Sequence, residues 1–201
     1  MQLYAGLAMY GASSALMVRS TLGLDPWDVF HQGLADHLRL SIGVVSIAVG
    51  AIVLLGWIPL RQRPGLGTIS NVVLVGACLD LALEVLPATQ RLAPRIGYLL
   101  GGILLCGIAT GLYITARFGP GPRDGLMMGI PGRIGLSIRV TRTIIEASVL
   151  AAGWLLGGTV GVGTVAYAVA IGPLAQLFLR LFATETDQVS APAGDVAAAP
   201  L

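Results

Sequence analysis

The sequence predicts an all-α membrane protein of six transmembrane helices, built as two inverted repeats of three helices each. Composition is the first reason: 55% of the 201 residues are hydrophobic and 11% are charged, whereas soluble domains carry about 25% charged residues. Mean hydropathy is correspondingly high, at +0.84. The second reason is a series of six long apolar stretches, and the third is an internal repeat that pairs them.

The six apolar stretches are close to the roughly 20 residues that a membrane-crossing helix needs. They lie at 3–18, 41–60, 66–86, 97–116, 137–156 and 161–182. Together they predict one membrane domain over residues 1–182, whose first stretch lacks a basic leader and is expected to be retained. Residues 183–201 are small, polar and rich in Ala and Pro, so a disordered cytoplasmic tail is expected there.

An offset of 96 residues aligns the two halves without a gap, repeat 1 covering about 3–86 and repeat 2 about 99–182. About two dozen of roughly 84 paired positions are identical, including Gly, Pro and Asp, which makes the match specific. The repeat also supports a span at 137–156. That stretch carries Arg139, Arg142 and Glu146, but it pairs with the plainly apolar 41–60.

Three spans per repeat is an odd number, so the second copy starts from the opposite side of the membrane, as in many secondary transporters. If the N-terminus is cytoplasmic, eight arginines lie inside and four outside. The inside set is Arg61, Arg63, Arg117, Arg123, Arg133, Arg139, Arg142 and Arg180, and the outside set is Arg19, Arg39, Arg91 and Arg95. The positive-inside rule therefore favours both termini in the cytoplasm.

A polar segment follows the first span of each repeat and is predicted to form a short interfacial or re-entrant helix. Asp25 can cap such a helix, Pro26 suits its first turn, and Asp28 complements the positive end of its dipole. The second copy starts alike, at Pro122, and includes Asp124. Either these aspartates serve only as caps, or paired short helices aim their N-termini at a central site for an anionic group.

The third span of each repeat opens with the same motif, Gly65-Leu66-Gly67-Thr68 in one copy and Gly161-Val162-Gly163-Thr164 in the other. Tight helix packing is the simpler interpretation, and Gly97-x-x-x-Gly101 and Gly107-x-x-x-Gly111 are expected to pack in the same way. The alternative makes Thr68 and Thr164 hydroxyl ligands of a substrate.

Acidic residues inside spans are costly unless they face the protein interior or a partner. Glu146 follows Arg142 by one helical turn, which predicts a structural ion pair. Asp80 has no basic neighbour on its helix and is therefore the leading candidate for an ion, proton or substrate contact. Asn71 lies on the same span.

Several classes of function lack support in the sequence. There is no basic cluster for nucleic acid, no catalytic constellation, no metal motif and no cofactor motif, so the protein is not expected to be an enzyme. Cys78 and Cys106 are expected to be small apolar residues. His31 and His37 are expected to be solvated, because a separation of six does not suit a zinc pair.

The four motifs together resemble the YczE-like branch of the YitT/YczE bacterial integral membrane proteins. They are Gly23-x-Asp25-Pro26-Trp27-Asp28, Gly65-Leu66-Gly67-Thr68, Gly119-Pro120-Gly121-Pro122-Arg123-Asp124 and Gly161-Val162-Gly163-Thr164, in that order. The resemblance covers residues 1–182 and implies a multipass protein of the bacterial cytoplasmic membrane. It implies no substrate and no reaction.

The leading functional hypothesis is a small secondary transporter or exporter of a small solute, with its site between the repeats. The candidate ligands are Asp28, Thr68, Asn71, Asp80, Asp124, Thr164 and Tyr167. The alternative is a non-catalytic scaffold or substrate-binding subunit of a larger transport complex. The expected partners are the lipid bilayer, the solute, and a second copy or another membrane protein.

Overall fold

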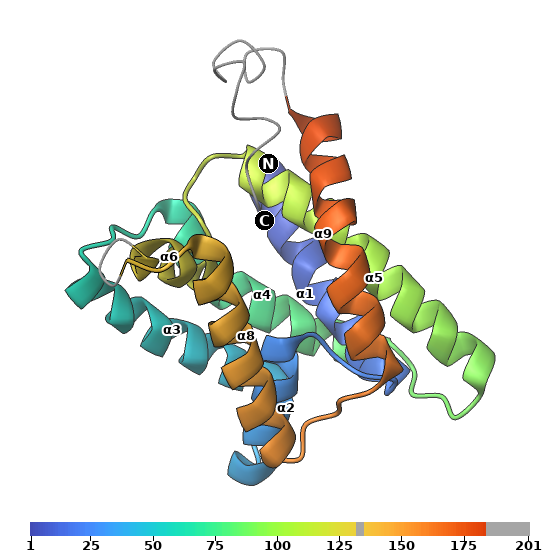
Figure 1. Cartoon of the computed structure of the whole chain (residues 1–201). Coiled ribbons are helices and arrows are strands. Elements are labelled where there is room, and N and C mark those ends of the chain that lie inside the picture. The colour runs from blue at the N-terminus through green and yellow to red at the C-terminus, as the bar shows by residue number, and fades with distance from the viewer. Residues whose placement is uncertain (132–134, 184–201) are drawn as a thin grey trace.

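The computed structural model describes residues 1–131 and 135–183, which form helices and their connections without a strand. The helices are α1 Gln2–Ser20, α2 Pro26–Leu38, α3 Ile42–Leu60, α4 Leu66–Val85, α5 Leu92–Thr115, α6 Pro122–Gly129, α8 Ile138–Leu155 and α9 Val162–Phe182 (Figure 1). Each predicted span coincides with a helix, and α2 and α6 are the predicted short helices. Two parts of the sequence prediction lie outside the described residues: Arg133, and the predicted tail that follows Ala183.

Four of these helices, α3, α4, α5 and α9, are long and apolar enough to cross a membrane. With α1 and α8, they form the body of an all-helical membrane protein. α1 and α8 have 19 and 18 residues, but polar and charged side chains lower their hydropathy, in α8 chiefly Arg139, Arg142 and Glu146. A membrane-crossing role for these two stays a prediction.

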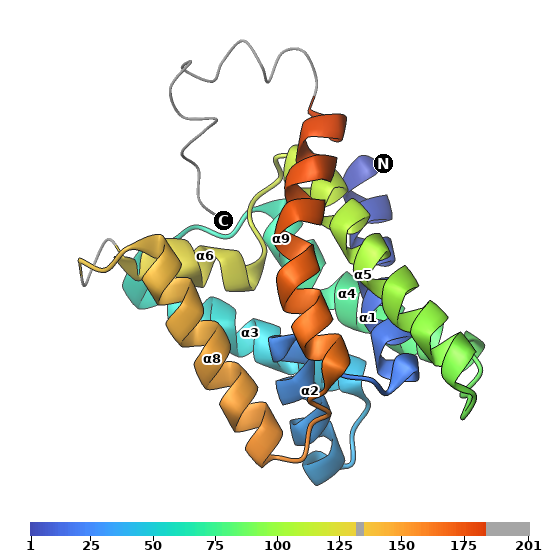
Figure 2. The same cartoon turned by 45° about the vertical axis from the view of Figure 1, so that its right-hand side comes forward.

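The long helices pack around α1, which lies along both α4 and α5, while α9 lies against α5 and α3 against α4. The short helices cross between the halves, because α2 packs mainly on α8 and α6 mainly on α3. Figures 1 and 2 place the start of α1 and the ends of α5 and α9 at one end of the molecule. The turn between α4 and α5 and the connection between α8 and α9 lie at the other end.

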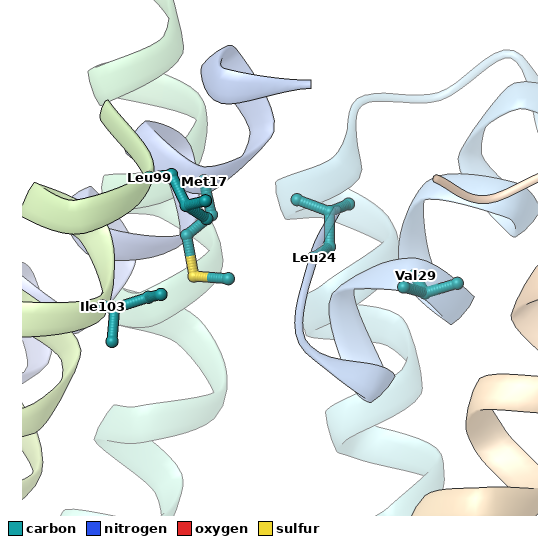
Figure 3. Close-up of a cluster of buried hydrophobic side chains, with 5 residues drawn as sticks. All are labelled: Met17, Leu24, Val29, Leu99 and Ile103. Atoms are coloured by element: carbon teal, nitrogen blue, oxygen red, sulfur yellow. The ribbon is translucent and has the colours of Figure 1, made fainter. Parts of the chain in front are cut away.

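One apolar cluster fixes the start of α2 against the long helices (Figure 3). Met17 of α1 and Leu99 and Ile103 of α5 form one side of it, and Leu24 and Val29 form the other. All five side chains are at most 5% exposed. Inside a membrane protein such a cluster acts through van der Waals packing and not through removal from water, and this packing holds the entry into the short helix.

Each Gly-x-Gly-Thr motif binds the connection that leads into the short helix of the other repeat, the α5–α6 connection in one case and the α1–α2 connection in the other. The Gly67 N–H donates to Phe118 O at 2.8 Å, and the Gly163 N–H donates to Leu22 O at 2.7 Å. Each connection then turns at a glycine of positive φ, Gly23 at 124° or Gly119 at 114°, a conformation that residues with a Cβ rarely adopt. Both motifs therefore lie in close backbone contact with the opposite half, as the packing interpretation expects.

Large and small residues change places between the two short-helix contacts. Trp57 of α3 covers Gly125 of α6 so closely that a Cβ at Gly125 would overlap the indole ring. The positions 96 residues away reverse the sizes, because Gly153 of α8 lies against Val29 and Phe30 of α2. The same contact is thus made twice. In the first the large side chain belongs to the long helix α3, and in the second the large side chains belong to the short helix α2.

The remaining glycine prediction is half right. Gly107 and Gly111 of α5 lie against Leu174 and Phe178 of α9, as helix packing requires. A Cβ added at Gly97 or Gly101 would meet nothing within 4 Å, so the packing prediction for that pair is wrong. Their side of α5 has no neighbouring helix within the described part of the chain.

A pair of equivalent glycines gives a direct test of this packing. Gly76→Ala places a methyl group 2.5 Å from Gly43 O, so α3 and α4 must move apart, at a cost of about 1–3 kcal/mol. Gly172→Ala, its counterpart in α9, meets nothing within 4 Å and should leave stability unchanged or raise it by up to about 1 kcal/mol, because alanine favours a helix interior more than glycine does. Thermal unfolding in detergent measures both, and equal melting temperatures would contradict the packing described.

Candidate functional site

A cavity of about 150 Å³ lies where the helices meet, and every described helix contributes to its wall. An apolar cavity of this size can hold a molecule such as benzene. Its chemistry comes from a few polar side chains among many valines and isoleucines. These polar groups include His31, Asn71, Tyr113, Arg123, Asp124 and Arg142.

Arg123, near the start of α6, is the central charge of the site. Its guanidinium lies 4.9 Å from the centroid of the Trp27 ring, a cation–π arrangement. Its Nη1 is 3.6 Å from Asp25 Oδ1, and its Nη2 is 3.9 Å from Asp28 Oδ1. Both separations exceed hydrogen-bond distance, so the N–H groups of Arg123 are neutralised by nearby charge but stay free to bind an acceptor.

The carboxylates beside Arg123 are deeply buried on α2. Asp25 is 4% exposed and accepts the Trp27 and Asp28 N–H groups at the helix start, which confirms its predicted capping role. Asp28 is 2% exposed; its Oδ1 lies 3.2 Å from His31 Nδ1, and its Oδ2 has no partner in the described residues. His31 is 1% exposed, so the prediction of a solvated histidine was wrong.

Burial controls the protonation of this cluster. It raises the pKa of Asp25 to about 7, with the nearby charge of Asp28 acting in the same direction and that of Arg123 opposing it. Burial also lowers the pKa of His31 to about 3, and the Arg123 charge adds to that effect. His31 is therefore neutral near pH 7, and Arg123 is the cation of the cluster.

The start of α6 is open where the start of α2 is capped. Gly121 stands at the position equivalent to Asp25 and offers no side chain to the first amides. Within the described residues, the backbone N–H groups of Arg123 and Asp124 have no acceptor. The atom nearest to a Cβ at Gly121 would be Asp124 Oδ2 at 2.9 Å, followed by Tyr113 Oη at 3.6 Å and Asn71 Nδ2 at 3.7 Å. The free backbone donors are therefore surrounded by one carboxylate, one hydroxyl and one amide.

Three of the predicted site residues line the cavity: Asn71, Asp124 and Tyr167. Asp124 accepts a hydrogen bond of 2.7 Å from the Tyr113 hydroxyl. Asp28 does not line the cavity but lies beside Arg123. The predicted ion pair of Arg142 with Glu146 is present, with Nε 3.0 Å from Oε1.

Three other candidates lie away from the cavity. The Thr68 hydroxyl donates to Pro120 O at 2.8 Å, and the Thr164 hydroxyl accepts the Gly161 N–H at 3.3 Å. Asp80 accepts the Ser41 hydroxyl at 2.5 Å and the Gly43 N–H at 2.9 Å, so it fixes the start of α3. In this structure these three side chains shape the backbone around the site.

Sequence reasoning missed Arg123, Trp27 and Tyr113 as parts of the site. The available signal was the difference between the copies: Trp27 pairs with Arg123, and Asp25 pairs with Gly121, inside a motif that otherwise repeats. Cys78 and Cys106 are free thiols. In residues 1–131 and 135–183, no three His, Cys, Asp or Glu side chains converge as a metal site would require.

A groove of about 440 Å³ adjoins the cavity between α8 and α9 and shares Arg142, Tyr167, Ile171 and Gly172 with it. These two helices scarcely touch. They splay apart towards the end of the molecule that holds the end of α9 (Figures 1 and 2). The corresponding helices of the first half, α3 and α4, are packed together.

Apolar helices of spanning length around a central cavity that holds a few polar side chains define a polytopic helical membrane protein. The chain belongs to a family of unknown function, DUF6198, whose model matches residues 1–180. The expected YczE-like assignment agrees, because the chain is 36% identical over 172 residues to the "Uncharacterized membrane protein YczE" of Bacillus subtilis, covering 84% of this chain and 80% of that protein.

Two further relatives carry no functional description in their names. One, from Haemophilus influenzae, is 44% identical over 177 residues, covering 88% of this chain and 81% of the relative. The other, YyaS of Bacillus subtilis, is 26% identical over 180 residues, covering 88% and 90%. No solved structure matches the chain.

The buried Asp25 gives a pH-dependent stability with a defined sign. Because burial raises its pKa to about 7, folding takes up a proton, and the folded state loses stability as pH rises from about 4 to 7. Asp25→Asn keeps the cap and removes this dependence. We expect the melting temperature of the variant, relative to that of wild type, to rise as the pH is increased from 5 to 8.

The comparison between the two proteins isolates Asp25, because the opposite contribution of His31, which destabilises the fold below about pH 6.5, is common to both. Parallel melting curves from pH 5 to 8 would contradict a raised pKa at Asp25.

Proposed function

We propose that this protein is a secondary transporter of a small solute, with six spans in two inverted repeats and the central cavity as its binding site. The observation that carries the proposal is the position of the cavity. There Trp27 and Arg123, counterparts under the 96-residue repeat, stack on each other. Residues that meet their own counterparts lie on the axis relating two halves, which is where inverted-repeat transporters bind substrate.

Reciprocal contacts support the inverted arrangement. The hydrogen bond from Gly67 to Phe118 and the one from Gly163 to Leu22 are related by the same offset of 96 at both ends. The contact of Trp57 with Gly125 has its counterpart in that of Gly153 with Val29. Contacts that exchange partners between halves are produced by a two-fold relation and not by a simple translation along the chain.

A difference between the halves supports alternating access. Gly76 of α4 lies against Gly43 and Ile47 of α3, whereas its counterpart Gly172 of α9 faces open space beside α8. One half is therefore closed along this seam, and the other is open into the cavity. Exchanging the two conformations would close the α8–α9 groove and open the α3–α4 seam, which exposes the same cavity from the other side.

The proposed location is the bacterial cytoplasmic membrane, with both chain ends in the cytoplasm. Arg123 and Arg142 line the cavity, so they are not counted among the arginines of the loops. The number of arginines on the cytoplasmic side then falls from eight to six, against four outside. The excess still favours a cytoplasmic N-terminus. In this orientation the α8–α9 groove faces the cytoplasm.

The topology is tested with single cysteines in a variant carrying Cys78→Ala and Cys106→Ala. Gln90→Cys lies in the α4–α5 turn and Arg63→Cys in the α3–α4 connection, both exposed. In intact cells, a membrane-impermeant thiol reagent should label position 90 and spare position 63, which becomes labelled only after lysis. Labelling of both positions from one side would contradict the inverted repeat.

Transport and gating are tested together with Arg139→Cys and Gly172→Cys in the same background, because these positions correspond to the closed contact of Gly43 with Gly76. Protein-dependent uptake of labelled small carboxylates, amino acids or amines into liposomes should stop when the disulfide forms and return on reduction. The single variants control for the substitutions themselves.

Full uptake with the disulfide formed would contradict gating by α8 and α9. If purified protein carries no solute and cells yield it in complex with an ATPase, the protein is instead a subunit of a larger transport complex.

A further inference from the structure

We propose that the cavity binds a small organic monocarboxylate at Arg123, and that one proton enters the Asp25–Asp28 pair when this anion binds. The inference rests on the proposed function, because it names the class of solute and the coupling ion for the same cavity. It is drawn from the charges that line the cavity, from donors that lack acceptors, and from the buried carboxylates behind Arg123.

The charges that line the cavity favour an anion. Two guanidinium groups, Arg123 and Arg142, face it against one carboxylate, Asp124. The Tyr113 hydroxyl already donates to Asp124, whereas Glu146 engages only Nε of Arg142. Asp25 and Asp28 behind Arg123 already balance its charge, so the unmet demand along this wall is for hydrogen-bond acceptors.

Donors without acceptors converge on the same wall. Within the described residues, the Arg123 guanidinium makes no hydrogen bond, and its two carboxylate neighbours lie at 3.6 and 3.9 Å. Trp27, 7% exposed and part of the cavity wall, has an indole Nε1–H without an acceptor. The open start of α6 adds two free amides beside Gly121, and a carboxylate is the group that such donors bind best.

The rest of the wall is apolar and matches an organic body. It is formed by aliphatic side chains: Val49, Val53, Val72, Val75, Ile114 and Ile171. With a volume of about 150 Å³, the cavity suits an anion of the size of butyrate or benzoate. A strongly hydrated divalent anion such as sulfate would lose its water against these valines without enough donors to replace it.

The proton follows from the number of negative charges around one cation. Asp25 and Asp28 already share Arg123 in a buried site, and a bound carboxylate would be a third anion beside it. The other titratable groups that interact with this pair are His31 of α2, Tyr10 of α1, Cys106 of α5 and Tyr167 of α9. None of these is a cation near pH 7, so none can neutralise the added charge.

Protonation of the aspartate pair restores the balance. The carboxylate and one proton from solution enter together, the proton resides on a carboxyl oxygen of Asp25 or Asp28, and the net charge of the site is unchanged. The raised pKa of Asp25 near neutrality is consistent with this role. Release of the anion returns Arg123 to the aspartates and frees the proton on the side to which the cavity is open.

The first test compares sodium butyrate and sodium benzoate with butylamine hydrochloride and alanine, at equal ionic strength, by thermal shift and calorimetry on detergent-purified protein. The carboxylates should raise the melting temperature in a concentration-dependent way. Arg123→Gln and the charge-preserving Arg123→Lys should weaken binding by roughly tenfold or more. The matched control Arg91→Gln, exposed at the turn between α4 and α5, should bind as wild type does.

The Lys variant keeps the charge next to the two aspartates, so it separates loss of binding from loss of folding. Stabilisation by butylamine or alanine alone, or carboxylate binding that is unaffected in Arg123→Lys, would overturn the anion site.

The second test counts protons. Calorimetry near pH 8, where Asp25 with a pKa of about 7 is mostly ionised, in phosphate, Tris and imidazole buffers should give an uptake approaching one proton per bound carboxylate, and Asp25→Asn should reduce it. Uptake of no proton in wild type would overturn the coupling. Transport of an amine that depends on Asp124 would support the transporter proposal and refute the carboxylate site. A carboxylate that binds but is never transported would support the carboxylate site and refute the transporter proposal.

Discussion

The structure depends on satisfying the backbone of two short polar helices inside an apolar assembly. Within a membrane domain, unpaired N–H and C=O groups cost several kcal/mol each, so irregular chain needs partners supplied by the protein. Each connection receives them from the opposite half, through the amides of Gly67 and Gly163. Neither half can hold its own short helix in this way, and the cavity exists because both halves are required to complete the arrangement.

The sequence predicts the helices well because each is encoded locally. Apolar runs of spanning length locate the long helices, and the Asp25-Pro26 cap and Pro122 locate the starts of α2 and α6. The internal repeat adds a long-range prediction that hydropathy alone lacks, a helix at Ile138–Leu155 despite its charges. Local physics and the duplication together account for most of the fold.

The site was only partly predictable, because its chemistry arises between residues far apart in sequence. Asp28 and His31 look like the polar face of a surface helix, yet both are buried, because Asp28 lies beside Arg123 of α6 and His31 lines the central cavity. Asp80 appears isolated in its helix, yet its partners Ser41 and Gly43 lie across the α3–α4 interface. The exchange of a large for a small residue between Trp57 and Gly153 could not be predicted, because it makes sense only when the contact partner of each residue is known.

Divergence between the copies has a consequence for how such a site can arise. In the proposed inverted arrangement, a homodimer of single repeats could place only identical side chains against each other at the axis, either two indole rings or two guanidinium groups. Two unpaired guanidinium groups in a buried position would repel each other strongly. Joining both copies in one polypeptide removes that restriction, and the stacking of Arg123 on Trp27 is a contact that two identical chains could not make at their axis.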